Sequence, residues 1–210
     1  LLDRGVVYAI AHVRGGGEMG KPWYENGKLA GKMNTFTDLV DTTRHLTESG
    51  YGDPQRVAVR GGSAGGLTVG AAINLDPERF RAAVAEVPFV DVVNTMIDET
   101  LPLTIVEWEE WGNPNIEEEY AWIRPYSPYE NSTAGEYPAL LITAGLNDPR
   151  VQYWEPAKWT AKLRTSPIGD RPVLLKTEMG AGHFARSGRY DVWRDEAFVV
   201  AFILDQITGT

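Results

Sequence analysis

One serine lies between glycines at the junction of two differently patterned stretches. Residues 57–60 favour a short buried strand and residues 67–74 favour a helix. Between them lies Gly61-Gly62-Ser63-Ala64-Gly65-Gly66, which contains G-x-S-x-G in the strand–turn–helix context of a nucleophile elbow. In such a turn we expect a strained backbone at Ser63, and we expect a side chain at position 61 or 65 to collide with its neighbours. The Ala64 N–H, at the start of the helix, could then donate to an oxyanion. The alternative is a Gly-Ser turn without chemistry.

The composition is that of an ordinary globular protein. The 210 residues are 43% hydrophobic and 23% charged, which is enough for one domain with a core. The sequence has no apolar run long enough for a membrane span. The net charge of −9 argues against a nucleic-acid partner and allows a cationic ligand. Because the chain has no cysteine, disulfides and thiolate metal sites are excluded. We also expect neither a metal nor a cofactor. The first residue is Leu1 rather than Met, so we expect the natural N-terminus to lie further upstream.

Strand-like and helix-like stretches alternate along the chain. This alternation predicts βα units and a mostly parallel sheet of about five strands, flanked by helices. The expected strands are residues 6–13, 57–60, 82–87, 139–144 and 173–177, and the expected helices are residues 35–49, 67–74, 153–164 and 193–207. In the third helix we expect Trp154, Ala157 and Ala161 to face inward. Residues 88–137 are rich in proline and acidic clusters, so we expect them to cross over the top of the sheet, where binding residues tend to lie.

A second glycine pattern follows the first expected strand. Gly15, Gly17 and Gly20 match G-x-G-x-x-G, the spacing of a dinucleotide-binding loop. That function requires a helix opening at the third glycine. The following residues 21–27 contain proline, aromatic residues and another glycine, and they favour an irregular loop. We therefore set the dinucleotide interpretation aside.

Three residues of complementary chemistry follow expected strands. Ser63, Asp148 and His183 occur in the order Ser…Asp…His that is typical of α/β-hydrolases. Because the carboxyl ends of parallel strands meet in one crevice, we expect the three side chains to lie together. A serine hydroxyl needs a base such as imidazole, and the imidazole needs a carboxylate that fixes its tautomer. Taken singly, the Asp could be a turn former and the His structural.

Six motifs spread over nearly the whole chain carry a family resemblance. They are HVRGGGEMG (12–20), RGGSAGG (60–66), LTIVEWEEWGNP (103–114), SPYEN (127–131), DPRVQYWEPAKW (148–159) and GAGH (180–183). With these motifs the sequence resembles the catalytic domain of the prolyl oligopeptidase family, and within it the oligopeptidase B branch. The resemblance implies a cytoplasmic serine oligopeptidase that cleaves short peptides after Arg or Lys through an acyl-enzyme on Ser63. It also implies an α/β-hydrolase domain that is incomplete at its N-terminus, so that residues 1–210 lack the upstream strands and an N-terminal β-propeller.

The resemblance assigns substrate contacts as well. Glu107 and Glu109 match the family's acidic pocket, and paired carboxylates suit a guanidinium. The alternative is a solvated acidic run. Arg150 matches a position that binds a substrate carbonyl in the broader family. The family's oxyanion tyrosine follows the strand just upstream of Leu1, which leaves the Ala64 N–H as the donor.

Two other functions remain open on the sequence. An acylaminoacyl-peptidase or esterase of the same fold would keep the Ser, Asp and His residues without needing Glu107 and Glu109. A non-catalytic binding module would need none of them. The family's strand order also predicts a gap. The strand upstream of Leu1 belongs between residues 6–13 and 57–60, so these two stretches should lie apart unless they close up and pair.

Overall fold

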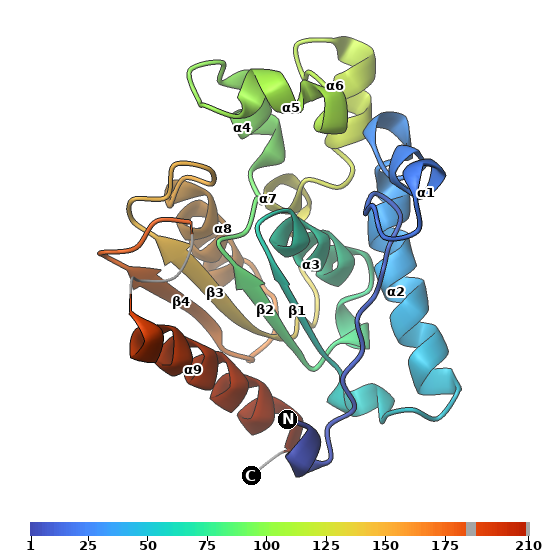
Figure 1. Cartoon of the computed structure of the whole chain (residues 1–210), viewed down its shortest axis with the longest axis vertical. Coiled ribbons are helices and arrows are strands. Elements are labelled where there is room, and N and C mark those ends of the chain that lie inside the picture. Colours follow the sequence, from blue (N-terminus) through green and yellow to red (C-terminus); the bar gives the residue numbers. More distant parts are fainter. Residues whose placement is uncertain (184–187, 209–210) are drawn as a thin grey trace.

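A parallel four-stranded sheet forms the centre of the molecule (Figure 1). The computed structural model describes residues 1–183 and 188–208. Within them the strand order is β1-β2-β3-β4, so each new strand is added beside the preceding one. The strands are β1 (Ala58–Gly62), β2 (Ala82–Glu86), β3 (Ala139–Gly145) and β4 (Val173–Glu178). This architecture confirms the predicted α/β class.

Helices cover both faces of the sheet (Figure 1). On one face α3 and α8 pack against the strands with α2 beside them, and α9 covers the other face. The helices are α1 (Lys21–Glu25), α2 (Met33–Glu48), α3 (Ala64–Leu75), α4 (Val92–Ile97), α5 (Thr104–Trp111), α6 (Glu117–Ile123), α7 (Pro128–Asn131), α8 (Trp154–Thr165) and α9 (Arg189–Thr208), with short 3₁₀ turns at Leu2–Arg4, Leu29–Gly31, Pro54–Arg56 and Pro77–Arg79. None of the helices in the described ranges is both long and apolar enough to span a bilayer.

The two-residue period of the strands assigns their side chains to the two faces. In β2, Ala83 and Ala85 belong to the core formed with α3 and α8, whereas Ala82 and Val84 pack against α9. The same alternation holds in β3. The strand is buried on both faces, which explains why its sequence is a continuous apolar run.

The stretch expected as the first strand is not a strand. Residues 6–13 are extended but pair with no strand in the described ranges, and Val7, Tyr8 and Ile10 are 60%, 65% and 69% exposed. The sheet therefore has four strands rather than about five. Of the two outcomes that the sequence left open, direct pairing of residues 6–13 with β1 is not observed in the described ranges. An apolar run becomes a strand only when another backbone accepts its hydrogen bonds, and here none of the described strands pairs with it.

Residues between β2 and β3 cross over the carboxyl ends of the strands, as expected. They form α4 to α7, and α4 to α6 lie at the top of the molecule (Figure 1). We call residues 88–137, which include α4 to α7, the cap. A second apolar core joins the cap to α2 and α3. It includes Phe36, Leu67, Phe89, Val92, Met96, Trp111, Ile123 and Tyr126.

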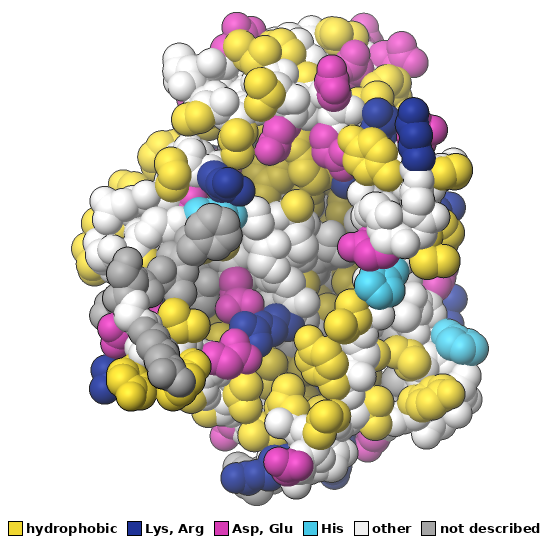
Figure 2. Space-filling view, viewed as in Figure 1, with side chains coloured by type: hydrophobic (Ala, Val, Ile, Leu, Met, Phe, Trp, Pro, Cys, Tyr) yellow, Lys and Arg dark blue, Asp and Glu magenta, His cyan; other side chains and the backbone are white. Residues whose placement is uncertain are grey.

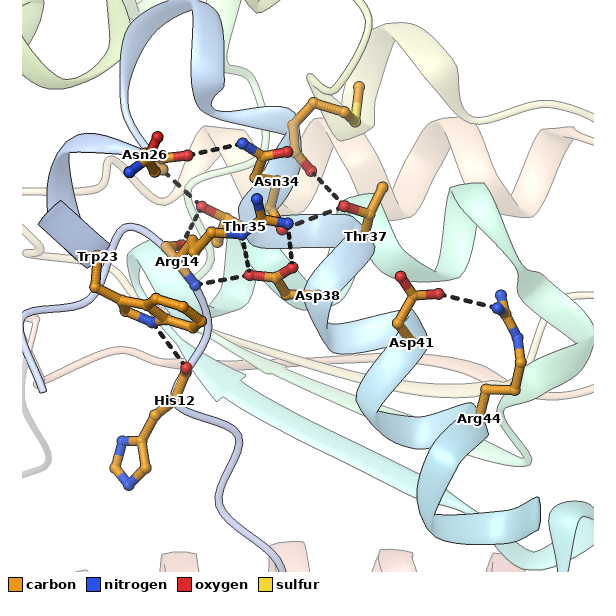
Figure 3. A network of polar contacts seen from close by, with 12 residues as sticks. His12, Arg14, Trp23, Asn26, Asn34, Thr35, Thr37, Asp38, Asp41 and Arg44 are labelled. Atoms are coloured by element: carbon orange, nitrogen blue, oxygen red, sulfur yellow. Dashed lines mark hydrogen bonds and ion pairs between the residues drawn. The ribbon is translucent and has the colours of Figure 1, made fainter. Parts of the chain in front are cut away.

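The glycine-rich loop after residue 13 is anchored on α2 (Figure 3). The backbone N–H and the guanidinium of Arg14 both donate to the carboxylate of Asp38, at 2.6–2.9 Å. These hydrogen bonds lower the pKa of Asp38. The Thr35 hydroxyl donates to the Arg14 carbonyl at 2.6 Å, and a Cβ at Gly27 would lie 2.0 Å from the Gly15 nitrogen. The glycines therefore allow two stretches of backbone to touch.

The expectation of an irregular segment after Gly20 is wrong, because the five-residue helix α1 begins at Lys21. Pro22 lies in its first turn, where a missing N–H costs no hydrogen bond. The inward face of α8 also differs from the prediction. Trp154 is 42% exposed and Ala161 is exposed, whereas Glu155, Pro156, Trp159, Thr160 and Leu163 are buried.

Candidate active site

Ser63 occupies the sharp turn between β1 and α3. Its φ of 56° and ψ of −120° lie outside the regions that residues with a side chain normally adopt. Two backbone hydrogen bonds hold this conformation. The Ser63 N–H donates to the Glu86 carbonyl at 2.8 Å, and the Phe89 N–H donates to the Ser63 carbonyl at 3.2 Å. The expected strained turn is therefore present, supported by β2 and the chain that leaves it.

The glycines around Ser63 permit close packing, but not all at the expected positions. A Cβ at Gly61 would lie 2.3 Å from the Gly65 carbonyl oxygen, as predicted. The collision expected at Gly65 is wrong, since a Cβ there would meet no atom within 4 Å. The close approach falls one residue later. A Cβ at Gly66 would lie 2.5 Å from the Pro88 ring, because position 66 faces the chain that leaves β2.

Val87 carries a second strained backbone beside the turn. Its φ is 40°, which is unusual for a β-branched residue. Its N–H donates to the Thr143 carbonyl at 3.1 Å, so the neighbouring strand supports the strain. This conformation ends β2 at Glu86, one residue earlier than the sequence predicts, and directs Pro88 and Phe89 over the Ser63 turn.

Asp148 uses both carboxylate oxygens. Its Oδ1 accepts the N–H groups of Arg150 at 2.8 Å and Val151 at 3.0 Å, and its Oδ2 lies 2.7 Å from Nδ1 of His183. The side chain of Asp148 is fully buried and that of His183 is 7% exposed. Because a carboxylate accepts hydrogen bonds, the pair places the imidazole proton on Nδ1 and leaves Nε2 to accept a proton.

The loops after β3 and β4 are hydrogen-bonded to each other, which brings the Asp148 carboxylate and the His183 imidazole together. The Asn147 N–H donates to the Ala181 carbonyl at 3.1 Å. A Cβ at Gly145 would lie only 2.2 Å from the Gly182 carbonyl oxygen, so this close approach requires glycine. The adjacency of β3 and β4 in the sheet therefore sets the Asp148–His183 contact.

Ser63 and Ala64 line a cavity with residues of the cap. The face shown in Figure 2 is hollowed beneath the helices at the top, with hydrophobic side chains inside the hollow and acidic side chains at its upper edge. Among the described residues, two charged ones line the cavity, Glu107 from α5 and Arg150 from the loop after β3. The remaining lining residues are Phe89, Thr95, Met96, Leu101, Leu103, Thr104, Trp111 and Val151. The cavity is therefore mostly apolar with one carboxylate and one guanidinium.

The three carboxylates of α5 point in different directions. Glu107 lines the cavity, and its Oε2 accepts the Trp111 Nε1–H at 2.8 Å. Glu109 is exposed and is not among the cavity-lining residues, so the pairing of Glu107 with Glu109 expected from the sequence is not observed. The reason is helical geometry, since side chains two residues apart lie on nearly opposite sides of a helix.

Glu110 ties α5 to the rest of the molecule. It accepts from the buried Lys32 ammonium at 2.8 Å, and that ammonium lies 4.4 Å from the centre of the Trp111 ring. Burial lowers the pKa of Lys32, and the Glu110 carboxylate opposes this effect. On the other side, a hydrogen bond to Glu110 raises the pKa of Tyr24 to about 12, with Glu109 contributing. These contacts fix the cavity wall that carries Glu107.

Sequence reasoning missed a buried carboxylate behind this wall. Glu155 has no exposed surface, and it accepts hydrogen bonds from the backbone of Val90 and Asp91 and from Thr95. Its signal in the sequence was weak, because a glutamate in the first turn of a helix is usually solvated.

A strained serine between a parallel strand and a helix, with an Asp–His pair at the ends of later strands, is the arrangement of serine hydrolases with the α/β-hydrolase fold. Residues 1–210 match the prolyl oligopeptidase family. The chain belongs to that family.

Individual relatives give the same result. The chain is 51% identical over 207 residues to "Protease 2" of Moraxella lacunata, covering 99% of this chain and 30% of that protein. It is 54% identical over 207 residues to "Dipeptidyl aminopeptidase BI" of Pseudoxanthomonas mexicana, covering 99% of this chain and 29% of that protein. Oligopeptidase B from Trypanosoma brucei, solved in a closed form with covalently bound antipain, superimposes with a TM-score of 0.91 at 50% identity over 94% of this chain and 28% of that one. The chain thus spans about 30% of the length of the curated relatives that it matches.

Proposed function

We propose that this chain carries the catalytic machinery of a serine oligopeptidase that cleaves short peptides after Arg or Lys. One observation carries the proposal. Ser63 and Glu107 line the same mostly apolar cavity, and the Asp148–His183 pair follows the two neighbouring strands. The cavity therefore offers a nucleophile at one place and a carboxylate for a cationic side chain at another.

The chemistry follows from the positions of these groups. His183 Nε2 takes the Ser63 proton as the Ser63 oxygen attacks the carbonyl carbon of the scissile bond. The tetrahedral oxyanion accepts a hydrogen bond from the Ala64 N–H at the start of α3, where the helix leaves N–H groups unpaired. Collapse breaks the C–N bond, and the leaving amine takes the proton from His183. Water then attacks the acyl-enzyme by the same steps and releases the carboxylate product. Asp148 holds the His183 tautomer throughout.

The cavity suits a long basic side chain. The apolar residues contact the aliphatic stem, and Glu107 accepts hydrogen bonds from the guanidinium or ammonium group. Arg150 lies on the wall near the loop of Asp148 and donates to a substrate carbonyl. Glu109 would add a second carboxylate only if its side chain were drawn around α5 by the substrate. The T. brucei oligopeptidase B with covalently bound antipain supports a covalent intermediate in a site of this kind.

The parent protein extends beyond these residues in this proposal. The coverage of about 30% of the relatives supports a larger chain. On the family resemblance, we propose that this larger chain also contains an N-terminal β-propeller and a second oxyanion donor. On the same resemblance we propose a cytoplasmic enzyme.

A second candidate is the release of N-terminal dipeptides, favoured by the 54% identity to a protein named dipeptidyl aminopeptidase. Both candidates use the same Ser63 chemistry and differ in how the peptide is positioned.

Product mapping separates the two candidates. The full-length protein is incubated with peptides of about ten residues that carry one internal Arg, and mass spectrometry identifies the fragments. We expect cleavage after the Arg wherever it lies, and none in the variant Ser63→Ala. Fragments that always lack two N-terminal residues, regardless of where the Arg is, would favour the second candidate. Cleavage after neutral residues as fast as after Arg would contradict the assignment of Glu107 to the basic side chain.

A further inference from the structure

A buried carboxylate behind the cavity takes no part in the proposed chemistry. Glu155 accepts the backbone N–H groups of Val90 at 3.0 Å and Asp91 at 2.9 Å through Oε2, and the Thr95 hydroxyl at 2.8 Å through Oε1. All three donors are uncharged, and Glu155 itself is fully buried. Keeping a carboxylate in such a place is expensive unless every hydrogen bond is made, so the arrangement requires a reason.

The groups that Glu155 binds belong to the segment that builds the cavity. Val90 directly follows Phe89, which lines the cavity and donates its N–H to the Ser63 carbonyl. Thr95 lies in α4 and lines the cavity too. One side chain of α8 thus fixes both the loop between β2 and α4 and the last turn of α4.

The connection continues from α4 to the helix that carries Glu107. The Thr95 carbonyl accepts from the hydroxyl of Thr104, the fully buried first residue of α5, at 2.8 Å. The Met96 carbonyl accepts from the Trp108 indole N–H at 3.0 Å. Because two hydrogen bonds join α5 to α4, the position of Glu107 depends on the position of α4. The position of α4 depends in turn on its hydrogen bonds to Glu155.

We propose that Glu155 is a positioning residue of the specificity cavity, which acts as a hydrogen-bond acceptor and, through Thr95 and Thr104, sets the place of Glu107 relative to Ser63. This inference rests on the proposed function and deepens it. It concerns the recognition of the basic side chain, since Glu155 touches neither the reacting atoms nor the cavity.

The electrostatics of Glu155 favour an acceptor role over direct attraction of a cation. Burial raises its pKa to about 7, opposed by the hydrogen bonds from Asp91, Thr95 and Val90 and reinforced by the Asp91 charge. Asp91 is itself buried and forms an ion pair with Lys158. A carboxyl group that is partly protonated at neutral pH, beside an existing ion pair, adds little attraction for a substrate cation. The role that remains for Glu155 is to hold its three hydrogen-bond donors in place.

The test compares two matched peptides in the full-length protein, one with Arg and one with citrulline, which has nearly the same shape without the charge. Thr95→Val removes the hydroxyl, and Thr95→Ser keeps it. We expect Thr95→Val to raise KM for the Arg peptide about 3- to 10-fold, the effect of one lost hydrogen bond. The ratio of kcat/KM for the Arg peptide to kcat/KM for the citrulline peptide should therefore fall in Thr95→Val, and Thr95→Ser should restore both this ratio and the low KM.

Two variants at position 155 separate geometry from charge. In Glu155→Gln the amide oxygen accepts both backbone N–H groups and the amide nitrogen donates to Thr95, so the preference for Arg should persist. Glu155→Met removes both acceptor oxygens, and with them all three hydrogen bonds, without replacing a residue of the cavity wall, and it should raise KM for the Arg peptide as Thr95→Val does. If Glu155→Met does not fold, the pair at Thr95 decides.

Three results would overturn the inference. The first is an equal loss of kcat/KM for the Arg and citrulline peptides in Thr95→Val, and the second is the same KM for the Arg peptide in Thr95→Val and Thr95→Ser. The third is loss of the preference for Arg in a folded Glu155→Gln variant. Glu107→Gln serves as the reference. If that variant keeps the Arg preference, the proposed basic-residue specificity fails by itself. If it loses the preference while Thr95→Val does not, only the positioning role fails.

Discussion

The replacement Glu107→Gln removes one charge from the cavity and little else. Glutamine keeps the size of the side chain and an oxygen that can accept the Trp111 indole N–H, which Glu107 accepts at 2.8 Å. The expected loss therefore comes from the substrate contact. A hydrogen bond to a charged group contributes about 1.5–3 kcal/mol, which corresponds to roughly 10- to 150-fold in kcat/KM for a peptide with Arg.

The matched control lies on the same helix. Glu109 is exposed and outside the cavity, and an exposed ionic contact contributes about 0–1 kcal/mol. Glu109→Gln should therefore lower kcat/KM for the Arg peptide by less than about fivefold. The assay measures kcat/KM for the Arg and citrulline peptides in the full-length protein. Equal losses in the two variants would show that the substrate draws both carboxylates together, as the sequence suggested. An unchanged Arg-to-citrulline ratio in Glu107→Gln would refute the cavity assignment altogether.

Three further predictions concern stability. Because burial raises the pKa of Glu155 from 4.5 to about 7, its protonated form is favoured in the folded state, so its contribution to stability is complete below about pH 4.5 and is lost as the pH rises through about 7. Relative to Glu155→Gln, the free energy of unfolding of the protein should fall by up to about 3 kcal/mol over this pH range. A difference in melting temperature between the two proteins that stays constant from about pH 5 to 8 would contradict this. Gly66→Ala should lower the melting temperature because of the close Pro88 contact, whereas Gly65→Ala should leave it unchanged or raise it, and the opposite order would contradict the packing described. Residues 1–210 expressed alone should aggregate or lack activity, because β1 has no partner among the described strands on its outer edge, and a monomeric, cooperatively melting, active preparation would refute this.

Local patterns were enough to predict the features that depend on a single element. The apolar runs at β2 and β3 predicted strands to within one residue, because a strand buried on both faces must be apolar throughout. The shorter apolar run at the start of β4 predicted that edge strand to within one residue as well. The Ser63 turn and the Asp148–His183 contact followed from motifs at strand ends, where the order of parallel strands brings loops together.

The errors arose where a neighbour decides the outcome. Residues 6–13 have the composition of a strand, but none of the described strands pairs with them. Val87 has high strand propensity, yet its contacts with β3 hold it at a φ of 40° and end β2 before it. Tertiary context overrides propensity in both cases.

Glu109 and Glu155 illustrate two further limits. The direction of Glu109 could have been predicted, since residues 107 and 109 cannot share one face of a regular helix. The predicted pair came from the family resemblance, which takes no account of this geometry. The burial of Glu155 could not have been predicted, because its three donors come from the loop after β2 and from α4, more than 55 residues away in sequence.

The central claim is that Ser63 is a nucleophile activated by His183 and Asp148, and covalent labelling tests it most directly. The full-length protein is treated with a fluorophosphonate probe, and the labelled peptide is identified by mass spectrometry. We expect one adduct, on Ser63, which disappears in Ser63→Ala and forms much more slowly in Asp148→Asn, because the amide cannot hold the same imidazole tautomer. An adduct on another serine, or undiminished labelling of Ser63→Ala, would contradict the claim.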